Sequence, residues 1–294
     1  MSISSRMKDF FNKYNVEIHP GSPIVNGKTQ WIAMDYENTF QENLKKYPEY
    51  LQYYIDNPID YDVNKQYFRS TFDFKPEKRK KVNLFLGCSH TFGIGLHWEH
   101  TWPFLLSKHI KGDIINLGIP GGGMEATYIT FKKYINFYDV QNVFHLQPIY
   151  ARYLVFDESK LSTFLPHHID KEGDPLGFAR KYYNIEYFKE LFYDPDYMVY
   201  SHLHNLDAIK YTALKNNIPY FYSNNLPEFI YPSQFKEMYG NSYRIKKVPK
   251  EVLDALKNDI LARDMAHPPL STNKEVVKTF LKYYKNHPEG FSTL

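Results

Sequence analysis

The stretch VNLFLGCSHTFGIG (82–95) decides the fold of this chain. Its first half is a short apolar run that ends in glycine, and its second half is a polar, glycine-rich turn. An apolar run of this length, bounded by turn residues, is typical of a strand buried on both faces of a parallel sheet. Ser89 follows that strand directly, so we expect its hydroxyl to project from a strand-to-helix turn at the carboxyl edge of the sheet.

Further apolar runs alternate with helical patterns downstream of this strand. The expected strands lie in DIINLGIPGGG (113–123), NVFHLQ (142–147) and IPYFYSNN (218–225), and the expected helices at 101–110, 124–138, 200–216 and from a Thr272–Glu275 capping box onward. Such alternation predicts a parallel sheet covered by helices on both faces. We therefore expect an α/β domain over residues 81–294 and an N-terminal extension over residues 1–80 that packs on this core. The basic run KPEKRKK (75–81) is expected to be a solvated linker.

Composition excludes several classes of protein. The 294 residues include 36 basic and 33 acidic side chains, a net charge of +3, which argues against a polycation built for nucleic acid. The mean hydropathy is −0.54, and no apolar run approaches the ~18 residues of a membrane span. Cys88 is the single cysteine, which excludes an internal disulfide and a Cys-rich zinc site. The N-terminus lacks a secretory signal, so we expect a cytoplasmic protein, in the host cytoplasm if the source is viral.

Three segments carry residues suited to acyl transfer. GCSHTFGIG (87–95) places Ser89 beside turn N–H groups that can donate to an oxyanion, and NLGIPGGG (116–123) exposes more such groups at the next strand end. In RDMAHPP (263–269), Asp264 and His267 are three residues apart, so the carboxylate can hold one imidazole nitrogen while the other faces a nucleophile. Each segment on its own also has a non-catalytic interpretation: a capped turn, a flexible loop and a chance pairing on the surface, respectively.

Taken together, in this order, the three segments resemble the SGNH (GDSL-type) hydrolase family over roughly residues 82–290. The resemblance places Ser89 at the nucleophile position, Gly121 at an oxyanion-hole glycine, and Asp264 and His267 at the acid and base positions. The stretch HTWPF (100–104) is similar to the segment that often follows the family's first block. The resemblance implies a flavodoxin-like three-layer α/β/α sandwich with a central parallel sheet, and esterase, lipase, acetylesterase or acyl-transfer activity.

The chain departs from the family pattern at two places. Cys88 stands where the first block has Asp, and the third strand runs into LQPIYARY (146–153), which lacks the Asn of the third block. Gln147 or Arg152 is then the candidate for the missing oxyanion donor, next to the N–H groups of Ser89 and Gly121. Cys88 itself, a thiol next to the serine, is a second candidate nucleophile.

Other residues are expected to line the pocket without taking part in chemistry. His90, Gly122 and Arg69 are the pocket candidates, and Asn64 and Phe68 lie near Arg69 in the sequence. The pairs His167–His168 and His202–His204 lack a carboxylate or thiolate at a recognised ligand spacing, so no metal site is expected.

These observations predict a serine hydrolase of carboxylic esters, with O-acyl groups of a glycan as the favoured substrate, working through Ser89, His267 and Asp264. No cofactor, nucleic acid or membrane is expected to take part, and a protein partner could dock on the N-terminal extension. An alternative is a non-catalytic binding or structural protein on the same scaffold. A third reading, a nucleotide- or phosphate-binding flavodoxin-like domain, uses the glycines but leaves Asp264 and His267 unexplained.

Overall fold

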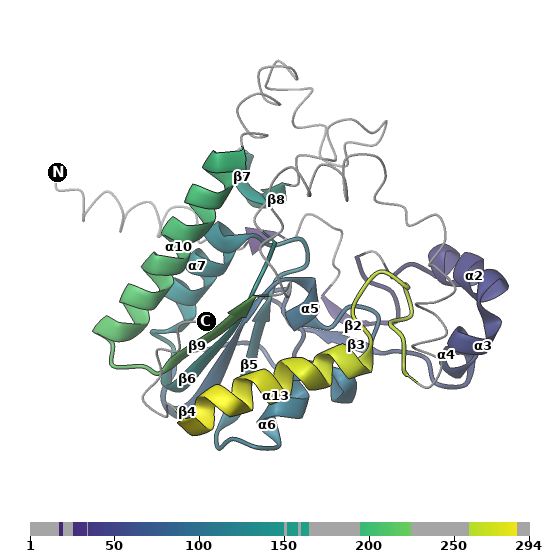
Figure 1. Cartoon of the computed structure of the whole chain (residues 1–294), viewed down its shortest axis with the longest axis horizontal. Coiled ribbons are helices and arrows are strands. Elements are labelled where there is room, and N and C mark those ends of the chain that lie inside the picture. The colour runs from purple at the N-terminus through teal and green to yellow at the C-terminus, as the bar shows by residue number, and fades with distance from the viewer. Residues whose placement is uncertain are drawn as a thin grey trace, which may run out of the picture.

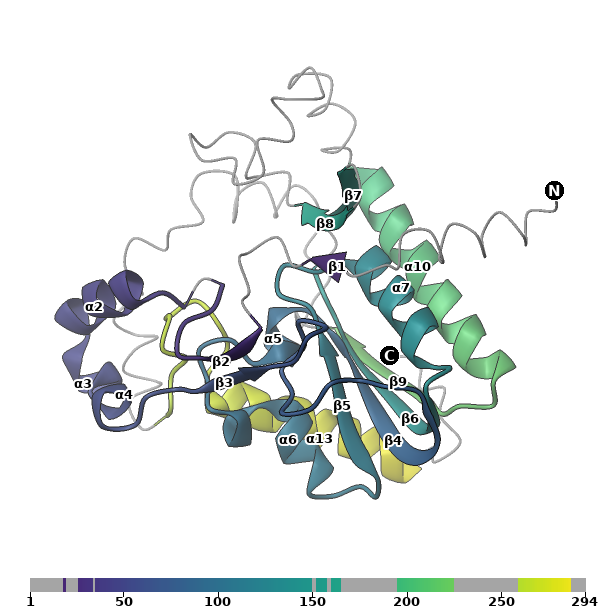
Figure 2. The ribbon, with the colours of Figure 1, turned by 180° about the vertical axis from the view of Figure 1, so that it is seen from behind.

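The computed structural model describes residues 18–19, 26–33, 35–149, 152–157, 160–164, 195–224 and 259–286. Its centre is a four-stranded sheet in the order β5-β4-β6-β9, in which every neighbouring pair is parallel. The strands are β4 (Glu77–Gly87), β5 (Asp113–Gly118), β6 (Tyr138–Gln147) and β9 (Tyr220–Asn224). The expected α/β class with a central parallel sheet is confirmed (Figures 1 and 2).

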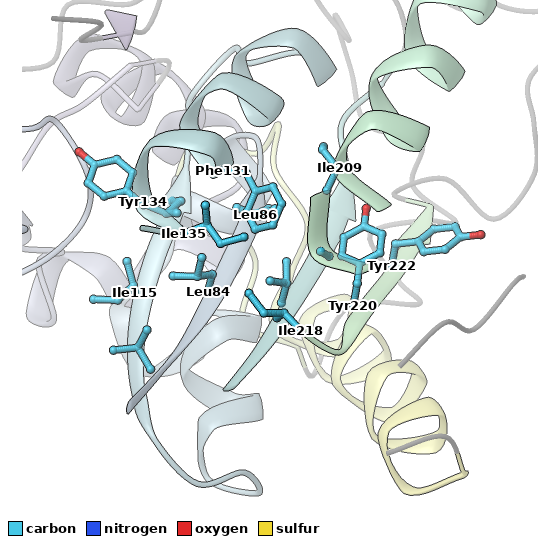
Figure 3. Close-up of a cluster of buried hydrophobic side chains, with 14 of the residues drawn as sticks. Leu84, Leu86, Ile115, Phe131, Tyr134, Ile135, Ile209, Ile218, Tyr220 and Tyr222 are labelled. Carbon is cyan, nitrogen blue, oxygen red and sulfur yellow. The ribbon is translucent and has the colours of Figure 1, made fainter. Parts of the chain in front are cut away.

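Helices cover both faces of this sheet, because side chains of a buried strand point alternately to opposite faces. Leu84 and Leu86 of β4 point into a cluster under α7 (Met124–Tyr134) and α10 (Pro195–Lys215), which Figure 3 shows. Phe85 points the other way and packs with Trp102 and Phe280 under α6 (Trp102–Ser107) and α13 (Leu270–Asn286). The apolar run that predicted this strand is therefore buried on both sides.

The described part of the N-terminal extension forms small elements beside one end of the sheet (Figure 1). They are an antiparallel ribbon of β2 (Gly27–Thr29) and β3 (Tyr61–Val63), and the short helices α2 (Glu37–Lys46), α3 (Pro48–Leu51) and α4 (Tyr53–Asp56). Their buried side chains share a cluster with Phe92 of the short helix α5 (Ser89–Phe92) and with Ile94 of the loop after it, and Met265 packs against this cluster. A separate three-stranded sheet is made by β1 (Ile18–His19), β8 (Lys160–Phe164) and β7 (Tyr153–Asp157).

Two local expectations are wrong. Strand β4 begins at Glu77, so most of the basic run expected as a linker is strand, and the expected boundary at residue 80 falls inside it. Helix α13 begins at Leu270, so Thr272 lies within its first turn rather than at a capping box. Pro269 precedes the first helical residue, where its missing N–H removes no helical hydrogen bond, and its carbonyl accepts the Asn273 N–H over 3.2 Å.

Candidate active site

Ser89 lies where strand β4 ends and turns into the short helix α5 (Ser89–Phe92). Ser89 is 6% exposed to solvent, whereas Cys88 is 1% exposed. Strand β5 approaches this turn so closely that a Cβ on Gly118 would lie 2.3 Å from the Phe92 nitrogen. Only glycine allows that approach, and it brings the carboxyl ends of β4 and β5 together at the serine.

The glycine-rich turn after β5 lies at the same edge of the sheet. The Ile119 N–H donates to the carbonyl of Gly87 over 3.0 Å, which ties this turn to the end of β4. Gly121 has φ +74. Within the described residues, neither the Gly121 N–H nor the Ser89 N–H donates a hydrogen bond. Two backbone donors are therefore available at neighbouring strand ends.

Asp264 and His267 form a hydrogen-bonded pair within one turn. His267 Nδ1 lies 2.5 Å from Asp264 Oδ2, and Asp264 Oδ1 accepts the N–H groups of Ala266 and His267 over 3.1 and 3.2 Å. Met265 between them has φ +57, a left-handed conformation that is unfavourable for its side chain and that tertiary contacts must hold. The turn thus places the carboxylate on one ring nitrogen and leaves Nε2 available.

The environment of Asp264 keeps this carboxylate ionised. Burial alone would raise its pKa, because the neutral form is favoured away from water. The contact with His267 and the two backbone N–H groups outweigh burial, so the pKa of Asp264 lies below its ordinary value. An ionised carboxylate on Nδ1 stabilises a protonated His267 ring, which is the arrangement that a general base requires.

The chain brings this turn against the serine turn. The Arg263 N–H donates to the Gly95 carbonyl over 2.8 Å, and a Cβ on Gly95 would lie 3.0 Å from Asp264 Oδ1. The ring of His267 packs edge-on against His90, the residue after Ser89, with ring centroids 5.5 Å apart. No hydrogen bond joins the side chains of Ser89 and His267 in the described part of the chain. Such bonds are often long before substrate binds, so the arrangement suits a base and a nucleophile.

A buried ion pair links the N-terminal extension to the segment that carries Asp264. Asp35 accepts hydrogen bonds from Arg263 Nε over 3.0 Å and Nη2 over 2.7 Å, and the two side chains are 0% and 2% exposed. Tyr61 donates to the same Asp35 carboxylate over 2.6 Å, and its hydroxyl accepts the Gly95 N–H over 2.8 Å. One chain of contacts therefore joins the extension, the residue before Asp264 and the loop after Ser89.

Two more side chains of the extension reach the same loops. Tyr54 donates to the carbonyl of Leu261 over 2.5 Å, and Asn43 donates to the carbonyl of Asp264 over 3.2 Å. Sequence reasoning missed this set, because no short-range pattern links Asp35 to an arginine 228 positions away. Tyr54 and Tyr61 of the extension are buried and take part in these contacts.

The two candidates for the third oxyanion donor differ in the structure. Gln147 ends β6, is 4% exposed, and its Oε1 lies 2.8 Å from His202 Nε2 of α10. Arg152 instead donates from Nη1 to the Gly122 carbonyl over 3.2 Å, and its backbone oxygen would lie 2.4 Å from a Cβ on Gly123. Arg152 therefore packs on the glycine-rich turn, while the Gln147 amide nitrogen has no partner among the described residues.

The remaining pocket candidates are structural neighbours of the site. Arg69 is 4% exposed and donates to the carbonyls of Gly93 and Leu96 over 2.6 and 2.9 Å, so it supports the loop after Ser89. Asn64 accepts the N–H groups of Gln66 and Phe68 and so holds a local turn.

His167 and His168 lie outside the described residues. In the part of the chain that is described, no cluster of three or more metal-binding side chains occurs. Among the described helices, none combines the length and apolarity needed to cross a bilayer.

The chain is similar to two kinds of known protein. It is 28% identical over 231 residues, 67% of its length, to the phenylalanine–tRNA ligase beta subunit of Mycoplasma capricolum subsp. capricolum, and it spans only 28% of that protein. Among solved structures, it is similar to AlinE4, a SGNH-hydrolase family esterase, and to a mutant of that esterase. Each comparison gives a TM-score of 0.31 and 15% identity over 62% of this chain and 95% of the other. No family model matches the chain. Similarities of this size support no inference about activity, which must come from the site itself.

Proposed function

We propose that this protein is a serine hydrolase of carboxylic esters, with Ser89 as nucleophile, His267 as general base and acid, and Asp264 as the group that orients His267. The observation that carries the proposal is the 2.5 Å contact of Asp264 Oδ2 with His267 Nδ1. That contact leaves Nε2 as the nitrogen that can take a proton, and the His267 ring lies against the residue after Ser89.

The proposed reaction proceeds in two acyl-transfer steps. Ser89 Oγ attacks the ester carbonyl carbon while its proton passes to His267 Nε2, and the carbonyl oxygen becomes an oxyanion. Collapse of this intermediate breaks the bond to the leaving alkoxide, which takes the proton from His267. Water then loses a proton to His267 and attacks the acyl carbonyl carbon. Collapse breaks the bond to Ser89 Oγ, which takes the proton back from His267, and the carboxylic acid leaves.

The N–H groups of Ser89 and Gly121, which donate to no described residue, support an oxyanion site in this scheme. Donors placed at neighbouring strand ends stabilise the charge that develops on the carbonyl oxygen, and each such donor is worth on the order of 10²–10³-fold in rate. The glycan O-acyl group remains our proposed substrate class. Its support is the abundance of tyrosines in the N-terminal part of the sequence; of these, Tyr54 and Tyr61 are engaged within the fold.

Labelling with a fluorophosphonate tests the proposal on the intact chain. We expect one adduct by intact mass on the parent protein and on Cys88→Ala, and no adduct on Ser89→Ala. His267→Asn should slow labelling by several orders of magnitude, because removing one triad member costs roughly 10⁴–10⁶-fold. His204→Asn, which changes an exposed histidine of α10, is the matched control and should label like the parent.

Different outcomes separate the competing functions. Loss of labelling on Cys88→Ala alone would move the nucleophile to the thiol. Absence of labelling and of turnover on a panel of short-chain aryl and sugar esters would contradict the hydrolase and favour the non-catalytic binding protein. Hydrolysis of acetylated sugars but not of aryl acetates would narrow the substrate to glycan esters.

A further inference from the structure

We propose that Gln147 is the third oxyanion donor and that His202 of α10 is its positioning residue, holding the Gln147 amide so that its N–H groups face the reacting carbonyl. This inference rests on the proposed hydrolase function. It assigns a role to α10, a helix that packs on α7 and β9.

The sheet places Gln147 beside the serine turn. Strands β4 and β6 are parallel neighbours, with Leu86 level with His145. Gln147 is thus about one residue beyond the level of Gly87, at the same edge from which Ser89 projects. Neighbouring strands lie about 4.8 Å apart, so a side chain at this position is within reach of an oxyanion held by the Ser89 N–H.

His202 determines which end of the Gln147 amide is free. The amide oxygen can only accept, so the 2.8 Å contact requires that His202 Nε2 carry a hydrogen. With Oε1 engaged, the Nε2 amine of Gln147 is the end left for a ligand. The reverse orientation would present an oxygen to a developing oxyanion and would repel it.

Burial keeps His202 in the form that this role needs. His202 is 9% exposed, and burial lowers its pKa to about 4, so the ring is neutral near pH 7. Its Nδ1 is buried and has no hydrogen-bond partner within the described residues. A buried polar atom left unsatisfied costs about 1–3 kcal/mol, and an apolar side chain at this position of α10 would avoid that cost. The hydrogen bond to Gln147 is the interaction of this ring that offsets the cost.

Arg152 does not compete for the role. Its guanidinium donates to the Gly122 carbonyl, so it supports the turn that carries Gly121. Its Nε also has no hydrogen-bond partner among the described residues, but that atom is buried. Gln147 is therefore the candidate whose free donor is held at the strand end by a described contact.

The inference can be tested by steady-state kinetics on an aryl acetate and by a double-mutant cycle. Gln147→Leu should lower kcat by roughly 10²–10³-fold, the loss of one oxyanion donor. His202→Leu should lower kcat by at least about 10-fold and by no more than Gln147→Leu, with KM nearly constant, because the lost interaction acts in the transition state. His202→Gln, whose amide can donate from a similar place, should recover most of that loss. His204→Leu, on the exposed side of the same helix, is the control and should behave like the parent.

The cycle distinguishes positioning from a general structural role. If His202 acts through Gln147, adding His202→Leu to Gln147→Leu should cause no further loss of kcat. Parent-like kcat in His202→Leu, or losses that simply add in the double variant, would overturn the inference while leaving the serine mechanism intact. A parent protein that neither labels with fluorophosphonate nor turns over esters would overturn the proposed function, and this inference with it.

Discussion

The buried pair of Asp35 and Arg263 offers the sharpest test of how the N-terminal extension supports the site. Burial raises the pKa of Asp35, and the contact with Arg263 offsets that effect only in part. Such a pair adds little net stability but is costly to break, because one partner is left as an uncompensated buried charge. Asp35→Asn keeps the shape of the side chain and removes the charge opposite Arg263, which is 2% exposed. We expect it to lower the free energy of unfolding by about 3–5 kcal/mol.

Equilibrium unfolding in urea, followed by far-ultraviolet circular dichroism, measures this loss. Glu275→Gln is the matched control, since it breaks the Glu275–Lys278 pair, whose side chains are 67% and 70% exposed. That change should cost no more than about 1 kcal/mol. A double replacement, Asp35→Leu with Arg263→Met, should be more stable than Asp35→Asn, because it leaves no unpaired buried charge. A cost for Asp35→Asn as small as that of Glu275→Gln would refute the reasoning.

Three further changes test other parts of the structure. Burial lowers the pKa of His202 to about 4 and that of His145 to about 3. The folded state therefore binds fewer protons than the unfolded chain below about pH 6.5. The free energy of unfolding should fall from there toward pH 4 by up to about 1.4 kcal/mol per pH unit for each ring. Urea titrations in which the free energy of unfolding has the same pH slope for His202→Gln and the parent would contradict this. Gly95→Ala, at φ +76, places a Cβ 3.0 Å from a carboxylate oxygen of the Asp-x-x-His turn, whereas Gly27→Ala, at φ +103, meets nothing within 4 Å. Both changes should lower the free energy of unfolding by about 1–2 kcal/mol, but only Gly95→Ala should lower kcat/KM for an ester. Equal kcat/KM for the two variants would argue against the placement of the Asp264–His267 turn beside Gly95. Asn273 accepts the first backbone N–H of α6 over 2.9 Å, so Asn273→Leu should cost about 1–3 kcal/mol by thermal unfolding, and an unchanged melting temperature would count against that link between α6 and α13.

Much of the sheet could be predicted because its signals are local. The apolar runs at 82–87 and 142–147 lie in β4 and β6, and the turn glycines follow β5 as expected. The boundaries were less predictable. The basic residues before Val82 lie in β4 because the backbone of a strand can pair whatever its exposed side chains are, as the Glu77–Tyr138 pairing shows.

The same distinction applies to the candidate site: its local pairing could be predicted, and its long-range contact could not. The pairing of Asp264 with His267 could be predicted because three residues of spacing bring the two side chains together in one turn. The contact of His202 with Gln147 could not, since these residues are 55 positions apart and belong to different elements. Sequence reasoning treated His202 as a structural or metal-binding histidine and left Gln147 and Arg152 as equal candidates.

The sequence by itself determined the class of fold, the order of strands and helices, and the three segments that carry Ser89, Gly121 and the Asp264–His267 pair. Those features depend on apolar periodicity and turn chemistry, which act over a few residues. Only the tertiary structure decided that Asp35 braces Arg263 across 228 positions and that residues 26–74 support the loops of the site. Buried polar groups must find partners wherever the packed chain brings them, and that choice depends on the whole fold rather than on neighbours in the sequence.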